Sequence, residues 1–216
     1  MVGLLVSALL LVPVTPTTPV TPIRPAATFR SAVLPLSPGL RSELRDQGFW
    51  HRGCPVALSD LRVLRATYRG FDGRVHTGRI VTNERATGPL TVVFRRLYGL
   101  RFPIRRMGTF PVAGDITASF SCRQAVPSPC SGGTGTGSWS MHAYGLALDL
   151  NPGENPYVGC GQSRDPATRR FFDRTRHRTG MITGKALAAF ASVGWGWGGL
   201  WAGDTKDYMH FSSTGH

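Results

Sequence analysis

The sequence predicts an α+β fold in which a small antiparallel sheet is flanked by helices. Residues 61–80 contain two strand-like runs on either side of Asp72-Gly73, a dipeptide typical of hairpin turns. Residues 89–98 instead carry apolar side chains at helical spacing. Further short strands are predicted over 102–107, 115–123 and 208–211, and one more helix over 186–193. No internal repeat is visible.

The composition is that of one globular domain with a tail, because 41% of the 216 residues are hydrophobic and 17% are charged. A formal net charge of +13, almost all from arginine, would favour polyanions such as anionic lipids, nucleic acid or acidic cell-wall polymers. The arginines are scattered, so a solvated basic surface explains them equally well. The chain shows neither a reading helix nor an aromatic ribonucleoprotein motif, so we expect no nucleic-acid partner.

The N-terminus resembles an export signal. Residues 2–14 form an apolar run too short to span a bilayer comfortably, and small residues at 25–27 offer a cleavage point. We therefore expect residues 1–27 to be a signal peptide and the protein to be secreted to the cell wall or beyond. Residues 28–52 are expected to connect this signal to a functional domain over 53–216, with a short helix around 42–47.

The four cysteines agree with an oxidising compartment. None lies in a CxxC arrangement, which argues against a thiolate zinc site. Cys122 and Cys130 enclose a short loop, so they are expected to form a local disulfide, with Cys54–Cys160 as the long one. Four cysteines allow three pairings, however, and the sequence does not choose among them.

The helix over 89–98 is expected to start at Gly88-Pro89 and to end at Gly99. Its apolar residues would pack on the sheet; these are Leu90, Val93, Phe94 and Leu97. The glycine-rich loop 131–137 lacks the Gly-Lys-Ser/Thr ending of a phosphate-binding loop. A Gly/Trp-rich turn is expected at 194–201.

A metal site is predicted from two distant segments. His142 and Asp149 lie seven residues apart, and Asp149 is set among apolar neighbours, where a buried carboxylate needs a compensating partner. Imidazole and carboxylate ligands suit zinc, and His210 supplies a third ligand. Asp207, three residues before His210, could act as general base and acid, and Arg123 could stabilise negative charge or hold a substrate carboxylate.

Each of these residues also has a purely structural explanation. Either histidine alone would more often be structural, Asp149 could cap a helix or turn, and Arg123 could pair with a surface acid. The tryptophans of the 194–201 turn could line a cleft or simply pack in the core; these are Trp195, Trp197 and Trp201.

The run 140–149, SMHAYGLALD, matches the SxHxxGxAxD pattern of the D-Ala-D-Ala carboxypeptidase (VanY-like) family of zinc peptidases. The run 207–211, DYMHF, is similar to the DxxHF form of the same family's second motif. The segments 119–123, 151–157 and 194–199 also resemble a secreted actinobacterial branch of this family. The likeness covers roughly residues 53–210.

The resemblance implies that His142, Asp149 and His210 bind Zn²⁺ and that Asp207 is the catalytic acid/base. It also implies that Arg123 contacts substrate or the transition state. The fold would be hedgehog/DD-peptidase-like, with the zinc on the open face of the sheet. We expect three residues on the substrate side, namely Ser140, Tyr144 and Trp197.

The resulting hypothesis is a secreted, monomeric zinc peptidase that removes a terminal D-alanine from peptidoglycan stem peptides. Anionic cell-wall polymers are a further expected partner. Two alternatives remain open: an L-alanyl-D-glutamate-type endopeptidase that cuts inside the stem, and a non-catalytic, zinc-stabilised wall-binding module.

Overall fold

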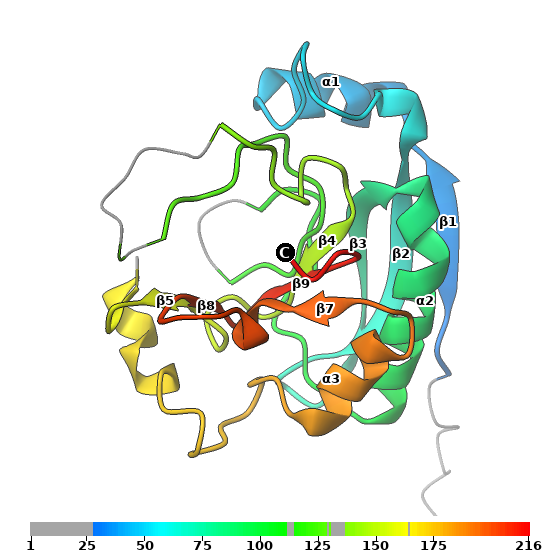
Figure 1. Cartoon of the computed structure of the whole chain (residues 1–216). Helices are drawn as coiled ribbons and strands as arrows, with labels where there is room; N and C mark the ends of the chain where they lie inside the picture. Colours follow the sequence, from blue (N-terminus) through cyan, green and yellow to red (C-terminus); the bar gives the residue numbers. More distant parts are fainter. Residues whose placement is uncertain (1–27, 112–114, 129, 131–136, 164) are drawn as a thin grey trace, which may run out of the picture.

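The computed structural model describes residues 28–111, 115–128, 130, 137–163 and 165–216. The predicted signal peptide and most of the glycine-rich loop 131–137 lie outside these residues. The described residues form three antiparallel sheets and three α-helices, with two of these helices packed against the sheets (Figure 1). This confirms the predicted mixture of helices and small antiparallel sheets. Within the described ranges, no helix has the length and apolar character needed to cross a membrane.

The first sheet has the strand order β1-β2-β3 and is built on a long hairpin. Strand β2 (Leu61–Arg69) pairs along its whole length with β3 (Val75–Asn83), so the predicted hairpin is confirmed. Strand β1 (Ser31–Pro35) pairs with the other edge of β2. Helix α1 (Pro38–Asp46) follows it and buries Leu40 and Leu44. Residues 28–52 are therefore packed into the fold, where the sequence suggested only a connection with a short helix.

Helix α2 (Glu84–Gly99) begins directly after β3, five residues before the predicted start at Pro89. The reason is the cap at Asn83, whose side-chain oxygen accepts a hydrogen bond from the backbone N–H of Arg85 at 3.0 Å. Pro89 then lies inside the helix, where it has no N–H to donate to the carbonyl of Arg85, a residue on the exposed side of the helix. The predicted inner face is confirmed as buried, and it consists of Leu90, Val93, Phe94 and Leu97.

Helix α3 (Gly184–Ala191) packs beside α2 and anchors the C-terminal strands. Phe190 on this helix stacks on Phe211 with ring centroids 3.5 Å apart and planes at 6°. Phe211 belongs to β9 (His210–Ser212), which pairs with β4 (Ala147–Asp149) and β7 (Gly196–Trp197). The main hydrophobic core thus extends from the first sheet through α2 and α3 to this second sheet.

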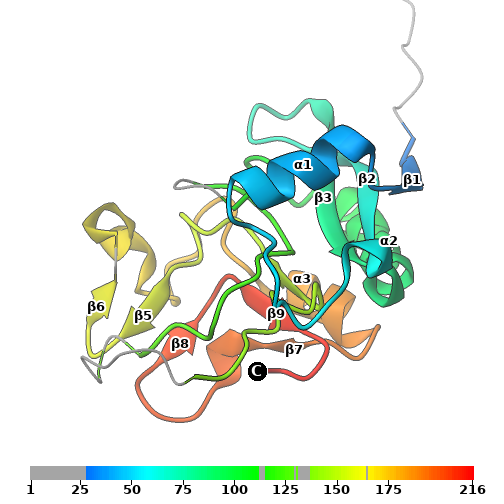
Figure 2. The same cartoon turned by 90° about the horizontal axis from the view of Figure 1, so that it is seen from above.

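The third sheet has the order β6-β5-β8 and lies at the end of the molecule away from β1 (Figures 1 and 2). It comprises β5 (Tyr157–Gly159), β6 (Gln162–Ser163) and β8 (Lys206–Asp207). The segments 102–107 and 115–123, predicted as strands, form only isolated bridges, such as Ala118 with Asp149. The last strand begins at His210, two residues later than expected.

The disulfides join Cys54 to Cys122 and Cys130 to Cys160, so the expected local Cys122–Cys130 pairing is wrong. The backbone explains the difference. The N–H of Cys122 donates to the carbonyl of Phe49 at 3.0 Å, which places Cys122 beside the 49–54 loop rather than across its own loop. Both bridges connect segments that are distant in the sequence.

Candidate metal centre

The three predicted ligands come together in the structure. His142 Nε2 lies 3.1 Å from Asp149 Oδ1 and 3.1 Å from His210 Nδ1. His210 Nδ1 lies 3.4 Å from the same Asp149 oxygen. Three atoms about 2.0–2.2 Å from one tetrahedral zinc ion would be separated by about 3.3–3.6 Å. The observed triangle is within a few tenths of an ångström of that size.

The second sheet positions two of these ligands. Asp149 at the end of β4 is the register partner of His210 at the start of β9, so their side chains leave neighbouring backbones at the same level. The adjacent Phe211 is fully buried against α3, which fixes the strand that carries His210. The placement of this pair follows directly from strand register.

The third ligand, His142, lies in a tight turn that packs against the start of α2. Gly145 in this turn has a φ of +65°, and a Cβ there would meet the backbone nitrogen of Asn83 at 2.6 Å. Instead, the Asn83 N–H donates to the Gly145 carbonyl at 3.0 Å, and its side-chain amide donates to the Tyr144 carbonyl at 3.0 Å. Only glycine fits both the conformation and the space. The residue that caps α2 therefore also holds the turn of His142.

Hydrogen bonds fix which ring nitrogen of each histidine faces the centre. His142 Nδ1 donates to the Ser119 carbonyl at 2.5 Å, and His210 Nε2 donates to the His216 backbone oxygen at 3.4 Å. A ring N–H held by a carbonyl leaves the other nitrogen as a lone pair, which is the usual arrangement behind a metal-binding histidine. Two lone pairs and a carboxylate oxygen therefore converge, and this donor set fits a divalent cation such as Zn²⁺.

The charges at two of the three residues agree with this donor set. At His210 burial would lower the pKa, but the hydrogen bond and charge of Asp149 outweigh it and raise the pKa, so a metal must displace a proton there. Burial is the main cause that lowers the pKa of His142, which favours the neutral ring that binds metals. Burial alone would raise the pKa of Asp149, but the two imidazoles outweigh it through charge and hydrogen bonds and lower the pKa. The centre therefore presents neutral imidazole at His142 beside an ionised carboxylate.

Asp207 is a half-buried acid whose carboxylate accepts a hydrogen bond from the Met209 backbone N–H. Its Oδ1 atom makes no hydrogen bond among the described residues. Burial, followed by the negative charge of Asp149, raises the pKa of Asp207 to about 7. A Cβ on Gly198 would meet the Asp207 carbonyl oxygen at 2.6 Å, so this glycine allows β8 to lie close to the adjoining turn. An acid with a pKa near neutrality is suited to accept and return a proton.

A cavity of about 430 Å³ opens onto the metal centre. Of the predicted residues, Arg123 and Ser140 line it together with the three ligands and Asp207. Arg123 is the one arginine or lysine among the described lining residues, and its charge acts to lower the pKa values of His142 and Asp207. The structure thus brings both predicted catalytic residues to the same cavity as the ligands.

Two residues expected on the substrate side do not line this cavity. Trp197 Nε1 donates to the Tyr208 carbonyl at 2.8 Å, and its ring packs beside Phe211. Tyr144 contributes through its backbone carbonyl, which accepts the hydrogen bond from the Asn83 side chain. Among the tryptophans of the 194–201 turn, Trp195 is buried in the core, whereas Trp201 lines the cavity with its ring centroid 5.6 Å from that of His210.

Further lining residues were not singled out from the sequence. Met141 and Met209 directly precede the predicted ligands His142 and His210, so adjacency to the motifs was the available signal, whereas Tyr157 is the strand partner of Asp207. The additional side chains are mostly apolar or aromatic, namely Val126, Trp139, Met141, Tyr157 and Met209. These side chains form apolar walls around the charged residues of the cavity, which are Arg123, Asp149 and Asp207.

Two imidazoles, a carboxylate and a nearby acid in one cavity are the arrangement expected of a metal-dependent hydrolase. A family model described as D-alanyl-D-alanine carboxypeptidase matches residues 134–213, and this confirms the resemblance stated above. The matched segment contains His142, Asp149, Asp207 and His210, and it is this part of the chain that is similar to that peptidase family. The match does not extend to the first sheet, α1 or α2. No curated protein and no solved structure matches the chain.

Proposed function

We propose that this protein is a secreted zinc peptidase that removes the terminal D-alanine from peptidoglycan stem peptides. The observation that carries the proposal is the convergence of His142, Asp149 and His210 beside the unpaired Oδ1 of Asp207. The family match over the same residues supports peptide hydrolysis as the reaction. The fold would accordingly be of the hedgehog/DD-peptidase type, with the metal held at the second sheet.

Zn²⁺ bound by these three residues would polarise the scissile carbonyl and would make an attacking water molecule more acidic. Asp207 accepts a proton from that water at its carboxylate and then delivers it to the nitrogen of the leaving amine. In the metal-free chain its pKa is already raised to about 7, which places the carboxyl group near the range suited to proton transfer in both directions. Because Oδ1 has no hydrogen-bond partner among the described residues, none of these residues competes with the water for this atom.

Arg123 supplies the positive charge that the substrate needs. Among the described residues, its side chain donates one long hydrogen bond, to the Gln124 carbonyl at 3.4 Å, so most of the guanidinium is available for a ligand. It would hold the C-terminal carboxylate of the peptide or the oxyanion that forms as the carbonyl is attacked. Ser140 and Trp201 would border the bound peptide within the cavity.

Export to the cell wall is supported by the apolar N-terminal run and by the cysteines. All four cysteines are paired in disulfides, which are typical of oxidising compartments. We further propose that the protein acts as a monomer and that its net charge of +13 retains it on anionic wall polymers. High salt should then weaken binding to isolated walls but spare hydrolysis of a small soluble peptide. Equal wall binding at low and high salt would exclude this retention.

The decisive experiment is incubation of the zinc-loaded protein with purified muropeptides, followed by mass spectrometry. Loss of one alanine mass, abolished by a chelator, is the expected result. A pentapeptide with a blocked C-terminus should resist the enzyme. Cleavage of the blocked peptide would identify an endopeptidase instead, and binding to walls without any cleavage would identify a wall-binding module.

A further inference from the structure

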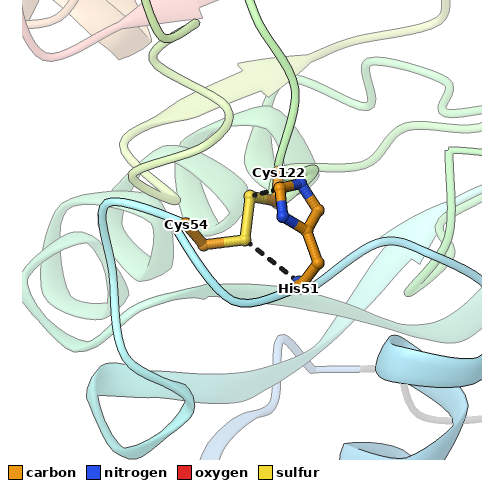
Figure 3. Close-up of side chains that lie close together, drawn as sticks. All are labelled: His51, Cys54 and Cys122. Carbon is orange, nitrogen blue, oxygen red and sulfur yellow. Dashed lines mark hydrogen bonds between the residues drawn. A yellow bond between two sulfur atoms is a disulfide. The ribbon is translucent and has the colours of Figure 1, made fainter.

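A second group of metal-ligand side chains lies outside the centre described above. His51, Cys54 and Cys122 each offer a ligand atom, and these atoms all lie within 4.8 Å of one another (Figure 3). Cys54 and Cys122 are joined as a disulfide in the structure. His51 is exposed, whereas Cys122 is buried. The group therefore lies at the surface with one ligand anchored in the interior.

His51 and Cys54 belong to one tight turn with an H-x₂-C spacing. The Cys54 N–H donates to the His51 carbonyl at 3.2 Å, and the His51 N–H donates to Cys54 Sγ at 3.2 Å (Figure 3). Gly53 within the turn has a φ of +94°. Short ligand spacings of this kind are typical of structural zinc sites. A backbone N–H directed at sulfur also stabilises the negative charge of a thiolate.

The imidazole of His51 is already oriented for metal binding. Its Nδ1–H donates to the Arg52 carbonyl at 2.9 Å, so its Nε2 carries the lone pair. That Nε2 atom faces Cys122 Sγ at 3.4 Å (Figure 3). A ring N–H held by a carbonyl while the other nitrogen faces the ligand position is the arrangement found behind metal-bound histidines.

We propose that reduction of the Cys54–Cys122 disulfide creates a second zinc site, held by His51 Nε2 and the two thiolates. With a trialkylphosphine as reductant, the S–S bond breaks, the phosphorus is oxidised to the phosphine oxide with oxygen from water, and two thiols form. Zn²⁺ then displaces one proton from each thiol and binds the neutral imidazole. Thiolate sulfur makes the site selective for soft or borderline ions. This site is independent of the proposed peptidase activity.

The site would preserve a tertiary connection that the disulfide provides in the oxidised protein. Cys122 belongs to the segment whose Ser119 carbonyl holds His142, and the next residue along, Arg123, lines the catalytic cavity. Metal bound at His51, Cys54 and Cys122 would keep the 49–54 loop attached to this segment after the disulfide opens. Zinc should therefore slow the loss of structure that follows reduction.

The test is titration of the phosphine-reduced full chain with Co²⁺, a spectroscopic substitute for Zn²⁺. Thiolate-to-cobalt charge transfer should appear in the near ultraviolet after reduction and be absent from the oxidised protein. The centre at His142 has no sulfur ligand and cannot produce this band. Displacement by Zn²⁺ should remove the band, and direct Zn²⁺ binding should release two protons per ion from the thiols.

Two variants identify the ligands. His51→Ala should weaken Co²⁺ binding at the thiolate site by about 10-fold or more. Loss of a residue that only hydrogen-bonds to a metal ligand typically lowers metal affinity by at least that factor, and His51 would be a ligand itself. His177→Ala, which removes another exposed histidine, is the matched control and should leave binding unchanged. A reduced protein without the band would overturn the proposal. So would a band that persists in Cys54→Ser/Cys122→Ser, or equal Co²⁺ affinities of the two histidine variants.

Discussion

Asp149 and His210 are direct register partners on β4 and β9, and the shared Asp149 oxygen lies 3.4 Å from the facing nitrogen of His210. The two ligands are thus fixed by backbone pairing rather than by loop conformation. Strand pairing defines position closely because a slip of one residue would turn either side chain to the opposite face. The metal centre therefore depends on the integrity of this short sheet.

Asp149→Ala should abolish tight zinc binding while the protein remains folded. The substitution removes the only charged ligand of the trio, leaving two neutral imidazoles with little affinity for a divalent ion. Zinc content after dialysis, measured by atomic spectroscopy, should fall from about one equivalent to near zero. Asp173→Ala, at an exposed acid, should keep its zinc. Retention of a full equivalent by Asp149→Ala would show that the metal is held elsewhere.

Asp207→Asn should retain zinc but lose peptidase activity. The amide has nearly the shape of the carboxylate but cannot accept a proton, and general acid–base catalysis is typically worth about 10²–10⁴-fold. Stem-peptide hydrolysis by the zinc-loaded variant is the measurement. The exposed neighbour Asp204→Asn is the control and should behave as the parent protein. An Asp207→Asn enzyme with unchanged kcat would remove Asp207 from the mechanism.

Asp207 should also make the metal-free protein less stable as the pH rises. Its pKa is raised to about 7 in the folded chain, against about 3.9 in an unfolded one. The folded state therefore binds the proton more tightly, so this stabilisation is complete below about pH 4 and is lost as the pH rises through 7.

The measurement is the free energy of unfolding by denaturant, in a chelator, for the parent and for Asp207→Asn. The parent's stability relative to the variant should decrease by about 1–4 kcal/mol between pH 4.5 and pH 8. Subtracting the variant's free energy of unfolding removes the opposing contribution of His142, whose lowered pKa favours the folded state at higher pH. A difference that is independent of pH would contradict the raised pKa of Asp207.

Gly145→Ala should destabilise the fold and weaken zinc binding together. Alanine at its positive φ costs about 1–2 kcal/mol, and the added Cβ would also collide with the Asn83 backbone at 2.6 Å. Gly73→Ala is the matched control, because Gly73 has a similar φ of +72° but open space around its Cβ. Thermal unfolding and zinc titration of both variants are the measurements. Equal effects of the two substitutions would show that the close approach to Asn83 contributes nothing.

The sequence was most informative where function constrains residue type. The ligands His142, Asp149 and His210 could be predicted because their chemistry and spacing are visible in the chain itself. The helical face of α2 and the hairpin at Asp72-Gly73 follow local periodicity and turn chemistry, which are also readable from sequence. The helical face and the hairpin are confirmed by the structure, which also places the three predicted ligands close together.

The errors arise where tertiary contacts override local patterns. Pro89 predicts a helix start, but the cap at Asn83, placed next to the His142 turn, begins α2 earlier. Cys122 has a cysteine eight residues ahead, yet its backbone bond to Phe49 directs it to Cys54. Trp197 belongs to an aromatic turn, but only packing shows that its ring lies beside Phe211. Such choices depend on which segments meet in space.

Asp207 and His210 are separated by two residues, yet they belong to different sheets, since β8 pairs with β5 and β9 pairs with β4. The proposed proton carrier and the proposed ligand are consequently positioned by separate backbone partners. Substitutions in the β5–β6 ribbon could move the carboxylate relative to the bound ion without disturbing coordination. During evolution, substitutions could therefore change the catalytic rate and the metal affinity separately. Residues 208 and 209, which connect the two strands, would accommodate the change in position of Asp207.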